Sequence, residues 1–203
     1  KGRVISDREK EATAYHEAGH ALVAASLKDA DPVHKISIIS RGRAGGYTMK
    51  LPTEENRLKT RKQFLAEMAT MMGGYASEQL MYKDVSTGAS NDLSEATKLA
   101  RRMVTKYGMS EAIGPMVIAT DEESVFLGRE LHQERRYSEE LSSKVDAEVS
   151  GLLRGAHELA VKTITQRKKV LDAIAKRLIE KETIEQDEFN DLMKEFDLKP
   201  LAI

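Results

Sequence analysis

The sequence has no cysteine among its 203 residues, and this absence restricts the chemistry open to it. Disulfides, thiolate zinc fingers, iron–sulfur clusters and cysteine nucleophiles are all excluded. A metal site in this chain must therefore be built from histidine, aspartate and glutamate side chains.

Long apolar runs are absent as well. The longest unbroken one, residues 21–25, is far shorter than the ~18 residues that a bilayer-spanning helix needs. We therefore expect a soluble chain with no transmembrane segment, and no signal peptide in its first residues.

Neither sign of charge is in excess: 32 lysine and arginine residues stand against 33 aspartate and glutamate residues, a net charge of -1. This balance gives no positive field to attract a polyanion, so we do not expect nucleic acid as a partner. The short basic runs Arg101-Arg102 and Arg167-Lys168-Lys169 are typical of solvated helix faces. At 40% hydrophobic residues the chain can form a packed core, and its length suits one large or two small domains.

The periodicity that is present is mostly helical. Ser6 and Glu9 have the spacing of a capping box, and the apolar pattern after them predicts one helix over residues 7–28. Residues 33–39 and 46–51 alternate partly between apolar and polar, which predicts two strands joined by a glycine-rich turn. We expect this hairpin to be the only substantial sheet.

A second capping box, Thr60 with Gln63, predicts a helix that runs to about Tyr82. The Gly73-Gly74 pair inside it indicates either the close approach of another backbone or a bend, and the sequence favours neither. A loop of small residues then leads into another helix, which Gly108 ends.

The last third of the chain predicts a pair of antiparallel amphipathic helices, from about Tyr137 to Ile179. A third capping box, Thr183 with Gln186, predicts a final helix. We expect that helix to pack through Phe189, Leu192 and Phe196. The fold class is therefore mainly α, with a small β-hairpin and a C-terminal helical bundle.

The most informative string is His16-Glu17-Ala18-Gly19-His20, an H-E-x-x-H pattern on the first predicted helix. Its two histidines are one helical turn apart, so both imidazoles project from one face and can bind a single Zn²⁺. Glu17 is rotated by ~100° from His16 and can reach a metal-bound water rather than the metal. The alternative is that both histidines are helix residues hydrogen-bonded near a core.

Two histidines do not complete a catalytic zinc site, which needs three protein ligands and an open position. The metzincin continuation is excluded, because Val23 and Ser26 stand where it requires glycine and histidine. The candidates for a third ligand are His34, Glu78 and Asp92. Asp92 extends the apolar stripe of its helix, which favours pairing or metal binding, although a helix N-terminal acid can also serve the helix dipole.

Six stretches of the sequence, in a fixed order over nearly the whole chain, can be compared with known families. They are Thr13-Ala14-Tyr15-His16-Glu17-Ala18-Gly19-His20-Ala21, Asp31-Pro32-Val33-His34-Lys35, Arg41-Gly42, Ser86-Thr87-Gly88-Ala89-Ser90-Asn91-Asp92, Tyr107-Gly108-Met109-Ser110-Glu111 and Val125-Phe126-Leu127-Gly128-Arg129. Together they closely resemble the peptidase domain of FtsH-type ATP-dependent zinc proteases. Two departures from the common pattern, Ser40 and Ser77-Glu78-Gln79, remove no proposed ligand.

The resemblance implies a mostly helical domain with zinc held by His16, His20 and Asp92, and with Glu17 as the catalytic carboxylate. It also implies a homo-hexameric parent with AAA+ ATPase domains, membrane-anchored, whose peptidase domains face the cytoplasm or an organellar matrix or stroma. No G-x-x-x-x-G-K-[ST] phosphate loop occurs here, so we expect only the peptidase part of a longer protein. We assign residues 1–135 to a zinc peptidase core and 136–203 to a C-terminal helical subdomain, folding as one cooperative domain.

The predicted function is zinc-dependent endoproteolysis of unfolded or membrane-extracted proteins. Residues 45–49 are a candidate edge strand on which an extended peptide adds main-chain hydrogen bonds, or an ordinary hairpin edge. The alternative function is a catalytically silent helical oligomerisation module with a structural zinc or none.

Overall fold

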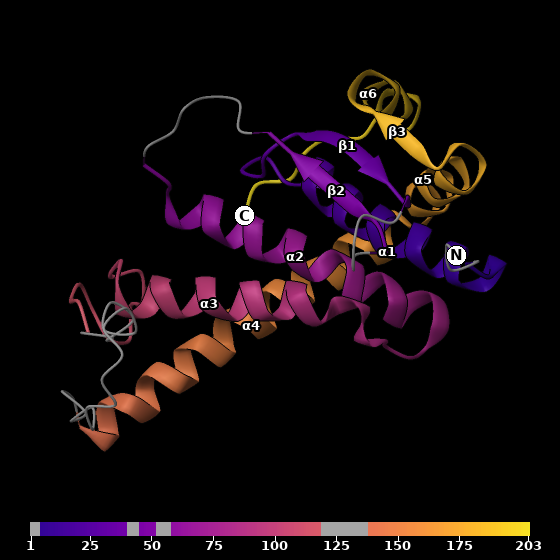
Figure 1. Cartoon of the computed structure of the whole chain (residues 1–203). Coiled ribbons are helices and arrows are strands. Elements are labelled where there is room, and N and C mark those ends of the chain that lie inside the picture. Colours follow the sequence, from indigo (N-terminus) through magenta and orange to yellow (C-terminus); the bar gives the residue numbers. More distant parts are fainter. Residues whose placement is uncertain (1–4, 40–44, 52–57, 119–137) are drawn as a thin grey trace, which may run out of the picture.

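The computed structural model describes residues 5–39, 45–51, 58–118 and 138–203, and these are mainly helical (Figure 1). The fold class predicted from the sequence is confirmed. Some predicted features lie outside the described residues: Ser40, most of the glycine-rich turn between the two predicted strands with its Arg41-Gly42 motif, and the Val125 to Arg129 motif. In chain order the elements are α1 (Asp7–Ser26), β1 (Val33–Ser37), β2 (Tyr47–Lys50), α2 (Arg61–Tyr82), the 3₁₀ turn η1 (Thr87–Ala89), α3 (Ser90–Thr105), α4 (Glu139–Gln166), α5 (Lys168–Lys181), β3 (Thr183–Glu185) and α6 (Gln186–Glu195).

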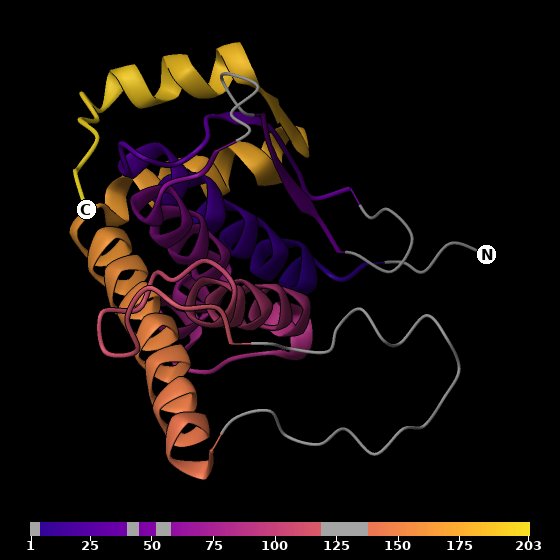
Figure 2. The same ribbon diagram turned by 90° about the vertical axis from the view of Figure 1, so that its left-hand side faces the viewer.

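The elements form layers around α1 and α2. Both views show the sheet and α6 on one side of these two helices and α3 on the other, with α4 running along the assembly (Figures 1 and 2). One continuous core of buried apolar side chains draws on α1, α2, α3, α4 and α5. The division at residue 135 stays a prediction. Within the described residues, no helix is both long enough and apolar enough to cross a bilayer.

Helix α1 begins as predicted, because both halves of the capping box at Ser6 and Glu9 are formed. It ends at Ser26, two residues earlier than predicted, where Leu27 turns into extended backbone. From Ala18 to Ala24 every residue of the helix is buried, so this part of α1 is packed on all sides. The H-E-x-x-H string therefore lies in the centre of the molecule.

Helix α2 passes through Gly73-Gly74 without interruption. A Cβ atom on Gly73 would lie 2.6 Å from the carbonyl oxygen of Gly19, and one on Gly19 would lie 2.9 Å from the carbonyl carbon of Gly73. The two helices thus cross with backbone against backbone, which only glycine at both positions permits. Of the two interpretations of the glycine pair, close approach is confirmed.

The sheet is larger than predicted. Its antiparallel strands are ordered β2-β1-β3, so the expected hairpin is present and a third strand joins its other side. The predicted capping box at Thr183 and Gln186 is wrong: Thr183 pairs with Ser37 in the sheet, and α6 begins after Glu185 without a side-chain cap. Ile184 explains the difference, because it is fully buried where β3 pairs with β1.

Helix α6 packs through Phe189 and Leu192 as predicted, but Phe196 is 39% exposed. Phe196 follows the last helical residue, so it no longer lies on the inward-facing stripe. The two helices predicted before β3 are present as α4 and α5, which are separated by Arg167 alone. Their predicted antiparallel packing is wrong: α4 packs on α2 and α3, and α5 packs on α1, because both helices contribute to the core around α1 and α2.

Candidate active site

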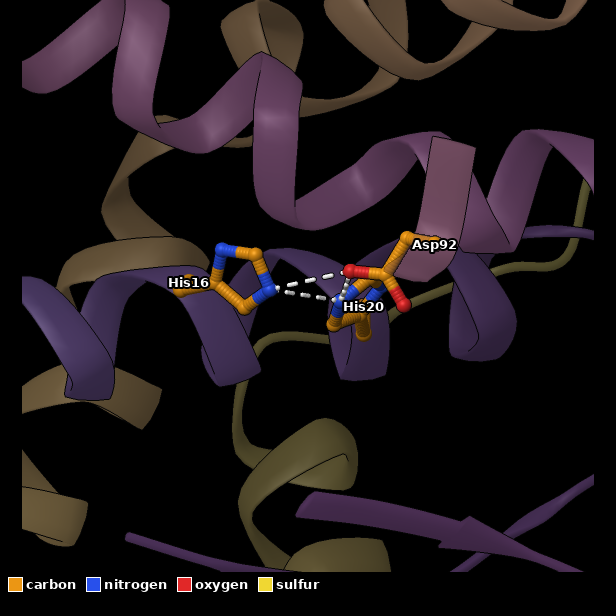
Figure 3. Close-up of side chains that lie close together, drawn as sticks. All are labelled: His16, His20 and Asp92. Atoms are coloured by element: carbon orange, nitrogen blue, oxygen red, sulfur yellow. Dashed lines mark hydrogen bonds and ion pairs between the residues drawn. The ribbon is translucent and has the colours of Figure 1, made fainter. Parts of the chain in front are cut away.

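Three side chains predicted as metal ligands meet between α1 and α3. His16 and His20 are buried side by side on α1, and Asp92 comes from the first turn of α3 (Figure 3). The Nε2 atoms of the two histidines are 3.0 Å apart, and Asp92 Oδ2 lies 3.2 Å from each. The Asp92 side chain is 27% exposed, so the group opens to solvent on that side.

The other ring nitrogens of the two histidines face fixed partners. His20 Nδ1 lies 2.7 Å from the backbone oxygen of Thr70, and His16 Nδ1 lies 3.3 Å from Glu78 Oε1. A backbone carbonyl oxygen can only accept, so His20 Nδ1 carries the proton and donates it. Donation from His16 Nδ1 to the carboxylate fixes the same tautomer there. Both Nε2 atoms are then left with free lone pairs.

The converging atoms fit a bound cation. Two Nε2 lone pairs and one carboxylate oxygen repel one another at about 3 Å unless a positive charge lies among them. Without a metal ion, a proton on His16 supplies this positive charge. Burial of the imidazole opposes the charged form, but hydrogen bonds to Asp92 and Glu78 and the nearby Glu17 charge outweigh it and raise the pKa of His16 to about 10. Burial also opposes ionisation of Asp92, yet the two histidines hold the pKa of Asp92 well below its usual range.

The donor set is the one expected of a catalytic zinc site. Among the described residues, His16, His20 and Asp92 form a group whose ligand atoms all lie within 4.8 Å of one another. Two imidazoles and one carboxylate supply three ligands and leave a fourth position for water or substrate. The two alternatives to metal binding explain only part of this arrangement. Hydrogen bonding of the histidines near a core explains their two Nδ1 contacts, and the helix dipole explains an acidic residue in the first turn of α3. Neither accounts for the convergence of Nε2 and carboxylate atoms.

The other two candidates for the third ligand have different partners. Glu78 accepts hydrogen bonds from the backbone N–H and the hydroxyl of Ser86, each 2.9 Å long, besides its contact with His16. Burial opposes ionisation of Glu78, but these hydrogen bonds outweigh it and lower the pKa of the carboxyl group. His34 Nδ1 lies 3.3 Å from Gln186 Oε1, which ties it to α6.

Glycine makes room for the first histidine. A Cβ atom on Gly74 would lie 2.7 Å from His16 Nδ1, so the imidazole occupies the space where a side chain of α2 would stand.

Glu17, the predicted catalytic carboxylate, is 6% exposed and faces the sheet. The hydroxyl of Thr48 on β2 lies 2.9 Å from Glu17 Oε2 and 3.3 Å from the Glu17 backbone oxygen. The sequence analysis placed Thr48 in the candidate edge strand of residues 45–49 but missed its bond to Glu17, and it missed the Thr70 carbonyl altogether. A polar residue in a partly apolar β-segment is the only signal that Thr48 gives, and a backbone carbonyl gives none.

Known proteins resemble this chain over most of its length. Residues 3–192 match the model of peptidase family M41. The chain is 50% identical over 195 residues to the ATP-dependent zinc metalloprotease FtsH 1 of Sphaerobacter thermophilus, with 96% of this chain and 30% of the relative aligned. It is 46% identical over 203 residues to the ATP-dependent zinc metalloprotease FtsH of Caldicellulosiruptor bescii, covering 100% of this chain and 33% of that protein.

A third relative, the ATP-dependent zinc metalloprotease FtsH of Veillonella parvula, is 45% identical over 194 residues, or 96% of this chain and 30% of its own length. The chain therefore spans about a third of the length of these relatives. The comparisons give no support to the alternative of a silent oligomerisation module. They confirm the resemblance inferred from the sequence motifs, and the chain belongs to peptidase family M41.

Proposed function

We propose that this chain is a zinc-dependent endopeptidase domain in which His16, His20 and Asp92 hold the metal ion. The observation that carries the proposal is the convergence of two histidine Nε2 atoms and one carboxylate oxygen. The names of the relatives, which describe zinc metalloproteases, support it. A bound zinc ion polarises a carbonyl group and lowers the pKa of water to about 7.

Glu17 is the general base of the proposed reaction. Its carboxylate accepts a proton from the attacking water and then delivers that proton to the nitrogen of the leaving amine. Its place next to His16 on α1, rotated by ~100°, brings the carboxylate near the ligands without making it one of them. Its burial keeps the carboxylate in a fixed environment of low solvent access.

The proposed substrates are unfolded or membrane-extracted polypeptides. In the described part of the sheet, β2 is an outer strand whose inner neighbour is β1, so its outer backbone groups are available to an extended peptide. Met49 and Leu51 are 39% and 47% exposed at this edge and offer apolar contacts. Recognition through backbone groups tolerates many side chains, which suits degradation rather than cleavage at one sequence.

The parent protein is proposed to supply the unfolding machinery. The relatives are named as ATP-dependent, whereas this sequence contains no phosphate-binding loop of the G-x-x-x-x-G-K-[ST] type. We infer a hexameric parent with AAA+ ATPase domains and a membrane anchor, and with its peptidase domains on the cytoplasmic, matrix or stromal side. Hydrolysis by this chain alone should then be confined to flexible substrates and indifferent to ATP.

The test is hydrolysis of an unfolded protein such as reduced casein by the purified chain. Activity should disappear with a zinc chelator, return with added zinc, and be absent from Glu17→Gln although that variant keeps its zinc. Undiminished hydrolysis by Glu17→Gln, or a chelator-resistant activity, would show that the proposal is wrong.

A further inference from the structure

Strand β2 and the residue before it contact the side chain of Glu17, the proposed general base. Gly46 and Thr48 are two residues apart in an extended segment, so they face the same side of the sheet. Both meet Glu17: a Cβ atom on Gly46 would lie 3.0 Å from Glu17 Cγ, and Thr48 Oγ1 lies 2.9 Å from Glu17 Oε2. One residue leaves room for the glutamate side chain and the other bonds its end.

The hydrogen bond has a defined direction. Both atoms of Glu17 near the Thr48 hydroxyl are oxygens that accept, so the hydroxyl is the donor. Within the described residues, Thr48 is the only group that hydrogen-bonds this carboxylate. The bond uses one lone pair of Oε2, and Oε1, which no described residue hydrogen-bonds, is left for the proton that the reaction transfers. The bond also restrains rotation of the carboxylate about its last torsion, which is otherwise broad.

We propose that Thr48 is a positioning residue that orients the Glu17 carboxylate for proton transfer. This inference rests on the proposed function, since it concerns the base of the same reaction. Glutamate has three side-chain torsions, and a displacement of ~1 Å at a catalytic group can cost about 100-fold in rate. The strand that is proposed to bind substrate through its outer edge therefore also fixes the base through its inner face.

A purely structural role for Thr48, as a tie between the sheet and α1, makes different predictions. Loss of a tie would lower the melting temperature and affect substrate binding along with turnover. Loss of a positioning contact lowers kcat while KM, zinc content and melting temperature change little. Replacement by valine keeps the shape of threonine and removes the hydroxyl, and replacement by serine keeps the hydroxyl.

The experiment compares Thr48→Val and Thr48→Ser with the wild-type chain, and Thr183→Val is the matched control. Thr183 lies in the same sheet, but its hydroxyl bonds Ser37, 3.0 Å away, so its loss should change kcat less than twofold. We expect Thr48→Val to lower kcat about 10- to 100-fold with KM within twofold of wild type and zinc still bound, and Thr48→Ser to restore most of the rate.

A crystal structure of Thr48→Val provides a readout that does not depend on activity. The Glu17 carboxylate should occupy a different orientation or several, while His16 and His20 stay in place. An unchanged carboxylate with unchanged kcat, or equal loss in Thr48→Ser and Thr48→Val, would overturn the inference. If the wild-type chain hydrolyses nothing, the proposed function fails, and the orientation of Glu17 in the variant still decides the positioning role.

Discussion

The close crossing of α1 and α2 predicts that two glycine-to-alanine changes alter the free energy of unfolding in opposite directions. Gly19 lies where the helix that carries both histidines touches α2, and Gly151 lies on the exposed surface of α4. An added Cβ at position 19 would lie 2.7 Å from Ser77 Cβ and even closer to the Gly73 carbonyl oxygen, whereas one at position 151 would meet nothing within 4 Å.

The magnitude follows from the overlap. Carbon atoms in contact are ordinarily ~3.5–4.0 Å apart, so the Gly19→Ala side chain overlaps α2 by about 1 Å. The added methyl group meets backbone atoms of Gly73 and the Cβ atom of Ser77, which is attached directly to the backbone. None of these atoms can move away by itself, so α1 and α2 must separate. Overpacking of this kind costs up to about 3 kcal/mol, and the better helix propensity of alanine returns about 1 kcal/mol. The net loss should be about 2 kcal/mol, or roughly 4–8 °C in Tm.

Separation of the helices should also weaken the metal site, because the 2.7 Å bond from His20 to the Thr70 carbonyl crosses this contact. Urea unfolding of the metal-free chain and zinc titration measure the two effects. Gly19→Ala should be less stable than wild type and bind zinc at least 10-fold more weakly. Gly151→Ala should be up to about 1 kcal/mol more stable with unchanged zinc affinity. Wild-type stability and affinity in Gly19→Ala would refute the reasoning.

Three other changes test separate parts of the account. Asp92→Asn should lose most zinc affinity because it removes an anionic ligand. Glu78→Gln should keep its zinc but lose about 10-fold in turnover, because His16 is then oriented less well. If zinc analysis shows that Glu78→Gln loses the metal and Asp92→Asn keeps it, Glu78 is the ligand. Tyr15→Phe removes the 2.9 Å bond to Asp172 and should cost about 0.5–1.5 kcal/mol in urea unfolding at pH 8. Burial, and next the bond to Asp172, raise the pKa of Tyr15 far above 10, so its contribution is complete below pH 10 and declines at higher pH. Tyr15→Phe should therefore lose less stability than wild type between pH 9 and 11, and identical pH profiles would contradict this.

Local signals in the sequence predicted the helix of the candidate site and the juxtaposition of its two histidines. The capping box at Ser6 and the spacing of His16 and His20 act within one or two helical turns, so tertiary contacts had little opportunity to alter them. The third candidate ligand was harder to predict. Reasoning from single residues left Glu78 and Asp92 both open, because each lies on a helix and their distance from the histidines depends on how three helices pack.

Features that depend on distant partners could not be predicted. Strand β3 is three residues long and pairs with β1 almost 150 positions away, so its Thr-x-x-Gln pattern looked like a helix start. Gly73-Gly74 signalled an unusual contact, but only the position of Gly19 showed which one. The hydrogen bond from Thr48 to Glu17 depends on how β2 lies over α1, and the pairing of β2 with β1 in the sheet sets that position.

The central claim is that His16, His20 and Asp92 bind a catalytic zinc ion, and anomalous diffraction at the zinc edge tests it most directly. Crystals of the zinc-loaded chain should show one strong anomalous peak bound by Nε2 of both histidines and by the Asp92 carboxylate. Glu78 should remain on His16 Nδ1, as it is in the described structure. A zinc ion bound by Glu78 instead of Asp92, or located away from the two histidines, would contradict the account.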